Sequence, residues 1–317
     1  MDNLHNLTEK LRQARETSWK HCGKTLTVYL PGMFSLDGLS GAYPAISITG
    51  SDCALQCDHC CGTTLQPMIS AMEPSILLEK SLDLAKKGSQ GILISGGCDR
   101  AGRLPWEGFL PAIAEIRKST DLYISIHCGL LDGETAFGLK DAGVDQALLD
   151  VIGDNETFQG IYHVEFGVSR ISETMKALSK AELPMVPHVV CGLHYGEIRG
   201  EKNALEMISR YPVEQLVIVS LMAIPGTPFG KLKGPSAEEI GEIIAQARWM
   251  MPRLRMSLGC ARRRGDTQTE LLAIDGGINR MALPSEEALD RAREYGLEIR
   301  YQRTCCSVSR DTTKEDW

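Results

Sequence analysis

Short apolar segments alternate with amphipathic segments along most of the chain, and this rhythm limits the fold more than any other feature. Eight apolar, strand-like segments occur at 45–49, 91–95, 122–127, 146–151, 185–190, 215–221, 254–258 and 278–283. Eight segments with helical spacing of apolar residues lie between and after them, at 74–87, 106–118, 133–140, 172–181, 202–211, 237–250, 267–274 and 285–295. This order predicts an α/β fold, a (β/α)8 barrel of the TIM type.

The rhythm also divides the chain into three parts. Residues 1–36 are expected to form an N-terminal extension that begins with an amphipathic helix over 4–19, and residues 37–300 the barrel. Residues 301–317 are a polar C-terminal tail. A chain of 317 residues with 43% hydrophobic content can bury one large core, and the single rhythm favours one.

Three cysteines lie shortly after the first predicted barrel strand. Cys53, Cys57 and Cys60 form a C-x3-C-x2-C triplet. Three thiolates on one short loop can hold three irons of a [4Fe–4S] cluster and leave the fourth iron without a protein ligand. A zinc site would usually pair two cysteines with a second ligand pair at a characteristic distance, and no such pair follows. The triplet therefore favours an iron–sulfur cluster over zinc.

Further cysteines follow other predicted strands. Cys98, Cys128, Cys191 and Cys260 come after the second, third, fifth and seventh of them. In barrels of this kind the reactive groups gather at the carboxyl ends of the strands. Together with Cys53, these residues predict a barrel mouth rich in thiols.

The composition excludes several classes of function. The net charge is −7 with no long basic run, so nucleic acid is not an expected partner. The N-terminus does not resemble a signal peptide and no apolar stretch reaches membrane-spanning length, so we expect a cytoplasmic protein with no membrane partner. The cytosol keeps thiols reduced, and the eleven cysteines are therefore expected to be buried small residues or cluster ligands, not disulfides.

Two sets of cysteines compete as ligands of a second cluster. One is the set at the strand ends: Cys98, Cys128, Cys191 and Cys260. The other combines Cys98 and Cys260 with two tail residues, Cys305 and Cys306. Cys128 and Cys191 each precede a glycine, where a small buried thiol packs well. The tail cysteines lie among Arg, Thr and Ser and have no apolar core to fill, so we prefer the tail set. Cys22 is an alternative member, and Cys61 has no assigned role.

The triplet resembles that of the radical SAM superfamily, in which an aromatic side chain precedes the last cysteine; here that residue is His59. The segment Ile94-Ser-Gly-Gly-Cys98 is similar to the Gly-Gly-Glu element that holds the methionyl amino group of S-adenosylmethionine (SAM) in that superfamily. Gly96 and Gly97 match it, whereas Cys98 stands at its acidic position. The resemblance implies a [4Fe–4S] cluster and SAM as cofactors.

From about Thr25 to Cys306 the chain resembles the biotin-synthase-like branch of that superfamily, and most of all the split lipoyl synthases. The motifs that carry this resemblance are Tyr29-Leu-Pro-Gly, Pro44–Gly50, Cys57–Cys60, Ile94–Cys98, Tyr162-His163, Pro187-His188 and Leu258-Gly-Cys260. In the split lipoyl synthases two related radical SAM proteins insert two sulfur atoms into a protein-bound octanoyl chain. The resemblance implies an auxiliary iron–sulfur cluster as sulfur donor. It also implies three partners: a second radical SAM protein, an octanoyl carrier (a lipoyl domain or a glycine-cleavage H-type protein), and a ferredoxin or flavodoxin.

The resemblance assigns further residues. It places Gly192 and Leu193 at the adenine of SAM. By their own chemistry and position, Asp150 after the fourth strand suits the ribose hydroxyls, and Arg170 could meet the SAM carboxylate. Cys260 stands where biotin synthases have an arginine that ligates the auxiliary cluster. In lipoyl synthases a C-terminal segment folds over the barrel mouth, and residues 303–307 are similar to that segment.

The single histidines at strand ends have two possible interpretations. His127, His163 and His188 could bind the substrate or the nucleoside, or could be satisfied structural residues. Three other functions also remain open. They are a single-cluster enzyme of the hydrogenase-maturation or methylornithine type, a biotin synthase acting on dethiobiotin, and a non-enzymatic iron–sulfur carrier.

Overall fold

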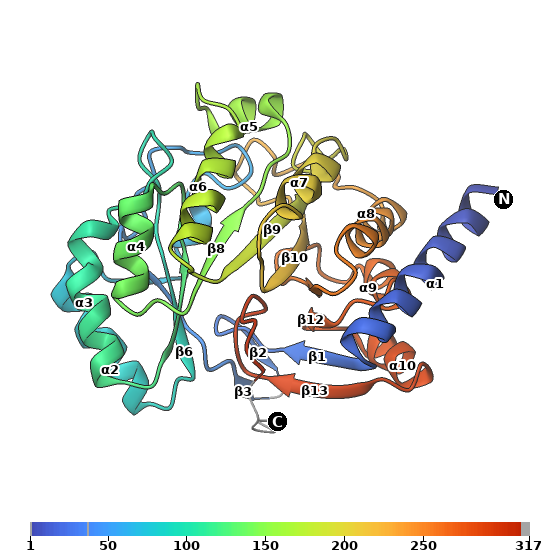
Figure 1. Cartoon of the computed structure of the whole chain (residues 1–317), viewed down its shortest axis with the longest axis horizontal. Coiled ribbons are helices and arrows are strands. Elements are labelled where there is room, and N and C mark those ends of the chain that lie inside the picture. Colours follow the sequence, from blue (N-terminus) through green and yellow to red (C-terminus); the bar gives the residue numbers. More distant parts are fainter. Residues whose placement is uncertain (1, 37, 312–317) are drawn as a thin grey trace.

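The computed structural model describes residues 2–36 and 38–311 and has one large parallel sheet at its centre (Figure 1). The sheet has 11 strands in the order β13-β1-β12-β11-β10-β9-β8-β7-β6-β4-β5. Their bounds are β1 Thr25–Tyr29, β4 Ala45–Ser47, β5 Ile69–Ser70, β6 Gly91–Ser95, β7 Tyr123–His127, β8 Gln146–Asp150, β9 Met185–Cys191, β10 Gln215–Ser220, β11 Arg255–Leu258, β12 Arg280–Ala282 and β13 Glu298–Gln302. A separate hairpin pairs β2 (Ser35–Leu36) with β3 (Leu39–Ser40).

The sheet curls into a half-barrel with helices on its outer face, so the predicted α/β fold of the TIM type is confirmed. All eight predicted barrel strands are present, as β4 and β6 to β12. The helices are α1 Asp2–Cys22, α2 Pro74–Lys86, α3 Trp106–Ser119, α4 Gly133–Asp141, α5 Asn155–Tyr162, α6 Ser169–Lys180, α7 Glu201–Ile208, α8 Ala237–Met250, α9 Thr267–Asp275 and α10 Glu286–Glu294, with a 3-10 turn η1 at Thr63–Leu65. Nearly every strand residue from β6 to β12 is buried, as expected for strands covered on both faces.

Helix α5 and strand β1 were not predicted, and neither were the short elements β2, β3, β5 and η1. Helix α5 follows β8 and is capped by Asp154, whose carboxylate accepts a hydrogen bond from the Thr157 backbone N–H at 2.9 Å. Strand β1 lies within the expected N-terminal extension, but it pairs with β12 and β13 in the main sheet. Helix α1, which precedes it, packs on the outside of α8 and α9. No helix within the described residues is long and apolar enough to cross a membrane.

The polar tail enters the half-barrel after β13 and runs through its interior, as the dark red loop in Figure 1. Four buried polar side chains from the strands donate hydrogen bonds to its backbone oxygens: Gln146, Gln215, Ser257 and Arg280. Gln146 and Gln215 are the first residues of β8 and β10, so they hold the tail from the amino ends of the strands. The tail therefore lies inside the half-barrel instead of over its mouth, because these inward-facing groups pair with its backbone.

Candidate active site

The triplet loop begins just after β4 and brings three thiols together. The backbone N–H groups of Cys60 and Cys61 both donate to the carbonyl oxygen of Cys57, at 3.0 and 2.8 Å. This tight turn places the thiols of Cys57 and Cys60 in hydrogen-bond contact, and Cys53 lies near enough to act electrostatically on Cys57. The hydrogen bond from Cys57, helped by the neighbouring His59, lowers the pKa of Cys60 to about 4.

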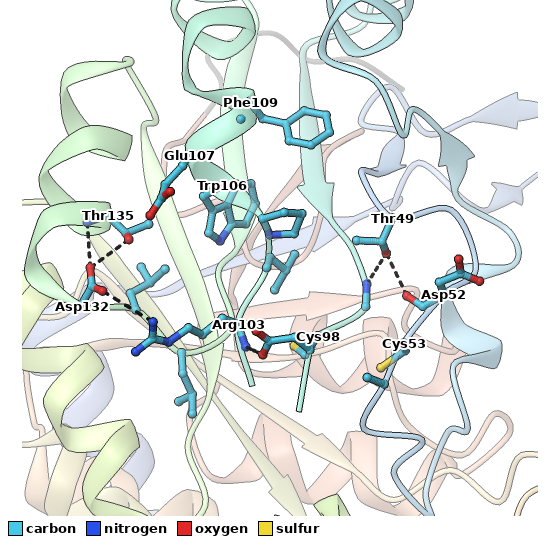
Figure 2. A pocket seen from close by; sticks show the side chains of 18 of the residues that line it. Thr49, Asp52, Cys53, Cys98, Arg103, Trp106, Glu107, Phe109, Asp132 and Thr135 are labelled. Atoms are coloured by element: carbon cyan, nitrogen blue, oxygen red, sulfur yellow. Dashed lines mark hydrogen bonds and ion pairs between the residues drawn. The ribbon is translucent and has the colours of Figure 1, made fainter. Parts of the chain in front are cut away.

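The glycine pair at the end of β6 touches the triplet loop directly. A Cβ atom on Gly97 would lie 1.9 Å from the backbone oxygen of Asp52 and 2.6 Å from the Cα of Cys53, so only glycine fits. The Thr49 hydroxyl joins the two loops, since it accepts from the Gly97 N–H at 2.7 Å and donates to the Asp52 oxygen at 3.0 Å (Figure 2). The structure thus places Gly97 against the triplet.

Replacing Gly97 by alanine should disrupt this contact, because the added Cβ meets backbone atoms that cannot turn aside. We expect a loss of stability of about 2 kcal/mol and the loss of most iron bound by the triplet. Iron content after anaerobic reconstitution and chemical denaturation would measure the two effects. Gly108→Ala is the matched control, because a Cβ at this position in α3 would have no neighbour within 4 Å. Normal iron content in Gly97→Ala would contradict the prediction.

A cavity and a cleft meet at Cys98. The cavity, of about 100 Å³, lies within the mouth and is lined mostly by aliphatic and aromatic side chains, with Cys98, His127, Asp150 and Tyr162 as polar lining groups. The cleft, of about 910 Å³, lies outside, between the triplet loop and the first turns of α3 and α4 (Figure 2). The thiol of Cys98 is therefore part of the wall between an enclosed chamber and an open cleft.

The residues around the triplet fit an iron–sulfur cluster that binds SAM. The donors are three thiols from one loop, which suits iron–sulfur chemistry. Two buried polar atoms beside them, Nδ1 of His59 and the hydroxyl of Tyr162, have no hydrogen-bond partner within the described part of the chain. The rings of these two residues lie 5.4 Å apart. Unpartnered buried polar atoms indicate a polar ligand between the protein groups.

A cluster of three polar side chains, one from each of three strands, lies deeper in the half-barrel. Ligand atoms of His127, Asp150 and His188 lie within 4.8 Å of one another. Burial alone would raise the pKa of Asp150, but the charge of His127, whose Nε2 is 3.7 Å away, lowers it to about 2. Burial lowers the pKa of His188 to about 4, and this neutral ring bonds to Ser307 of the tail at 2.8 Å. Asp150 thus remains a carboxylate at the chamber wall.

The other predicted SAM contacts are more scattered. Gly96 lines the chamber, and Leu193 lines a small neighbouring cavity between β8 and β9. The N–H of Gly192 is already bonded to the buried carboxylate of Glu201 at 2.7 Å. The guanidinium of Arg170 lies 3.5 Å from Glu173, on its own helix α6. Arg170 is therefore not brought to the triplet, whereas Gly96 and Asp150 share a chamber with Cys98.

A second group of thiols forms where the tail passes the end of β11. The thiol of Cys306 is in hydrogen-bond contact with those of Cys260 and Cys305, and the Cys260 backbone N–H donates to the Cys306 sulfur at 3.4 Å. We call these residues the tail trio: Cys260, Cys305 and Cys306. Bonds from Cys306, and from the N–H and hydroxyl of Ser307, lower the pKa of Cys305 to about 7. Cys98, expected with this set, lies beside Cys53 instead.

A buried ion pair fixes the loop that carries Cys260. The guanidinium of Arg262 bonds to the Gly259 oxygen at 2.6 Å, the Glu270 carboxylate at 2.7 Å and the Ala282 oxygen at 2.7 Å. It therefore ties the end of β11 to α9 and to the end of β12. Only 2% of the Arg262 side chain and 7% of the Glu270 side chain are exposed, so the two charges depend on each other.

Replacing Glu270 by glutamine should leave the buried charge of Arg262 without its counter-charge. We expect the free energy of unfolding to fall by about 3 kcal/mol. Urea denaturation followed by circular dichroism would measure it. Glu294→Gln removes an exposed partner of Arg291 and should cost at most about 1 kcal/mol. Equal losses in the two variants would show that the buried pair is not specially important.

The remaining cysteines lie apart from both thiol groups or beside the triplet. Cys128 and Cys191 are fully buried in the core, and the Cys128 thiol bonds to the Gly129 oxygen at 3.2 Å. Cys22, at the end of α1, contacts the backbone oxygens of Arg253 and Leu254. Cys61 follows the triplet in a left-handed conformation, with φ of 45°. Cys128, Cys191 and Cys22 therefore pack in places away from the tail trio.

Sequence comparison relates most of the chain to biotin synthases and residues 217–314 to a known domain family. The family described as "Biotin and Thiamin Synthesis associated domain" matches residues 217–314, which include the tail trio. Biotin synthase of Neorickettsia sennetsu is 26% identical over 238 residues, covering 74% of this chain and 73% of that protein. Biotin synthase of Polaromonas naphthalenivorans is 24% identical over 289 residues, covering 83% and 80%.

Solved structures share the fold of the chain. Methylornithine synthase (PylB) has a TM-score of 0.65 at 15% identity, covering 93% of this chain and 89% of that one. HydG, a maturase of the [FeFe]-hydrogenase, has a TM-score of 0.66 at 14% identity, covering 93% and 68%. The chain is thus similar in sequence to biotin synthases and in fold to PylB and HydG.

The sequence did not reveal several residues that shape this site. Tyr162 lies beside the triplet and was noted only as part of a family motif. Gln146 and Gln215, which hold the tail, are amides at the starts of otherwise apolar strands. An amide at the start of an apolar strand was the one available signal, because a buried polar group needs a partner. The sequence alone does not say that the partner is the tail.

Proposed function

We propose that this protein is a radical SAM enzyme that inserts sulfur, one component of a lipoyl synthase that acts on a protein-bound octanoyl chain. The observation that carries the proposal is the tail trio, three thiols held together inside the half-barrel and apart from the triplet. Three cysteine thiols suit an auxiliary iron–sulfur cluster, which would be the sulfur donor. A single-cluster enzyme would have no use for them.

The chamber lined by Cys98 and His127 supports an aliphatic substrate. Its wall consists mostly of leucine, isoleucine, valine and phenylalanine side chains. At the triplet side it reaches Cys98, and at its inner end it reaches His127, which acts electrostatically on Cys305. An apolar chain bound here would lie beside the Cys98 loop, which contacts the triplet loop, and the apolar walls would exclude water.

In this proposal the residues of the chain bind and orient the cluster, SAM and the tail trio. The triplet would hold the cluster, Gly97 would seat the triplet loop on the strand end, and Asp150 would accept from the ribose hydroxyls. Gly96, which lines the chamber, would lie beside SAM. When reduced, the cluster supplies the electron that cleaves SAM to methionine and a 5′-deoxyadenosyl radical, which removes hydrogen from an unactivated carbon. Ser307 would orient Cys305 within the trio, and His188 would hold Ser307 in place.

Three partners belong to this proposal. An octanoyl carrier protein, such as a lipoyl domain or a glycine-cleavage H-type protein, would present the substrate at the mouth. A ferredoxin or flavodoxin would supply electrons, and a second radical SAM protein of the same pair would insert the other sulfur. The open outer cleft beside Cys53 leaves the triplet loop accessible from that side.

The test is a reaction with an octanoyllysine peptide, SAM and dithionite under anaerobic conditions. We expect 5′-deoxyadenosine and a peptide with a mass gain equal to one sulfur atom, together with loss of sulfide from the enzyme. Peptide unchanged beside abundant 5′-deoxyadenosine would reject the octanoyl substrate.

Biotin synthesis is the second candidate, favoured by the similarity of residues 217–314 to the domain associated with biotin and thiamin synthesis. The same assay with dethiobiotin in place of the peptide distinguishes the two. Sulfur gained by dethiobiotin and not by the peptide would replace our proposal with biotin synthesis. If neither compound gains sulfur and the triplet is the only iron site, a single-cluster reaction is indicated.

A further inference from the structure

A fourth thiol lies beside the triplet, and neither the triplet cluster nor the tail trio uses it. The sulfur of Cys98 has no hydrogen-bond partner among residues 2–36 and 38–311. Burial raises its pKa to about 12, and the charges of Cys53, Asp99 and Asp150 act in the same direction. Cys98 is thus a half-buried thiol beside the triplet whose surroundings do not explain it.

Two backbone contacts hold Cys98 against the triplet loop. The Ala54 N–H donates to the Cys98 carbonyl oxygen at 2.7 Å. The preceding residue, Gly97, touches the backbone of Asp52 and Cys53 so closely that no side chain would fit. The groups that act on the Cys98 thiol lie in its own loop, in the triplet loop and at the end of β8, and none lies in the tail.

An independent observation places a polar ligand at the same point. The Tyr162 hydroxyl is fully buried and lacks a partner within the described residues, as does Nδ1 of the buried His59. Tyr162 and Cys98 line the same chamber, and both are influenced by Asp150. A buried chamber with unpartnered polar atoms and a free thiol, next to three further thiols, is arranged for a ligand that contacts all of them.

We propose that Cys98 is a displaceable fourth ligand of the triplet cluster, bound to its open iron when SAM is absent and released when SAM binds. Binding breaks the S–H bond, forms an iron–sulfur bond and gives the proton to solvent. Release reverses these changes, as the amino nitrogen and carboxylate oxygen of SAM take the iron. No electron moves in either direction. The inference rests on the first part of the proposed function, a cluster at the triplet, and not on sulfur insertion.

The arrangement has a physical reason. An iron without a protein ligand is the one most easily lost or oxidised, and a thiolate protects it. The thiolate binds the iron through one atom only. SAM, which binds through two atoms at once, can therefore displace it.

The test compares two proteins in which Cys305→Ala and Cys306→Ala leave the triplet as the cluster site, one with Cys98 and one with Cys98→Ala. Each is reconstituted without SAM and oxidised with ferricyanide, and the [3Fe–4S] product is measured by electron paramagnetic resonance. We expect about tenfold more [3Fe–4S] product in the Cys98→Ala protein, because its fourth iron is lost more easily. Equal yields would overturn the proposal. Cys128→Ala is the control, a buried cysteine one strand away that bonds to its own neighbour.

A second measurement separates ligation from a packing role. The affinity for SAM, followed by the spectrum of the reduced cluster, should rise about tenfold in Cys98→Ala, because SAM no longer competes with the thiol. Lower affinity, or a failure of both Cys98→Ala and Cys98→Ser to hold iron, would overturn the proposal in favour of a structural role. Neither measurement uses an octanoyl substrate, so the proposal can fail while sulfur insertion stands, and the reverse.

Discussion

Alanine at all three triplet positions, Cys53, Cys57 and Cys60, should abolish SAM cleavage. We expect 5′-deoxyadenosine formation to fall by more than about a thousandfold, because no electron reaches the sulfonium without the cluster. Iron content should fall by about four atoms per chain. Chromatographic measurement of 5′-deoxyadenosine after adding SAM and dithionite would check the first expectation, and iron and acid-labile sulfide analysis the second.

The matched control is Cys61→Ala, which removes the thiol next to the triplet. Cys61 is half-buried, and its backbone N–H bonds to Cys57 whatever its side chain, so iron and turnover should stay normal. If the triple variant keeps about four irons per chain, a second cluster exists elsewhere and the tail trio is its expected site. If it keeps none, the tail trio does not bind iron and the sulfur-insertion proposal fails.

Alanine at Cys306 should separate radical formation from sulfur insertion. Cys306 is the central member of the tail trio, in contact with both Cys260 and Cys305, so its loss breaks both contacts. We expect sulfur insertion to fall by about a hundredfold, the effect of losing a ligand's support in a metal site. The formation of 5′-deoxyadenosine should continue, because the triplet lies in a different loop. Both products can be measured in one reaction mixture.

Cys191→Ala controls for the loss of any buried cysteine, since Cys191 is fully buried but lies in the core of β9. It should cost some stability and leave both products in their normal ratio. A Cys306→Ala protein that still inserts sulfur at the normal rate would remove the tail trio from the mechanism. A Cys306→Ala protein that forms no 5′-deoxyadenosine would indicate that the tail supports the whole barrel.

The local pattern of the sequence predicted the elements of this fold well. Strands such as β6 and β9 are short apolar runs between turn residues, and helix α8 begins at Ser236 and Glu239 in a capping box. The pattern did not predict helix α5, because its eight residues, Asn155–Tyr162, begin in an acidic stretch with few apolar residues. Strand β1 was missed because a single strand before the repeating pattern has no partner nearby in the chain.

The sequence by itself determined the triplet, because three ligands within eight residues come together in almost any loop conformation. Only the tertiary structure decided how the other thiols divide. Cys98 joins the triplet because Gly97 seats its loop on Cys53, and Cys306 meets Cys260, 46 residues away, because buried amides draw the tail through the half-barrel. Such contacts depend on the curl of the sheet and on partners distant in the chain, and local periodicity carries no information about either.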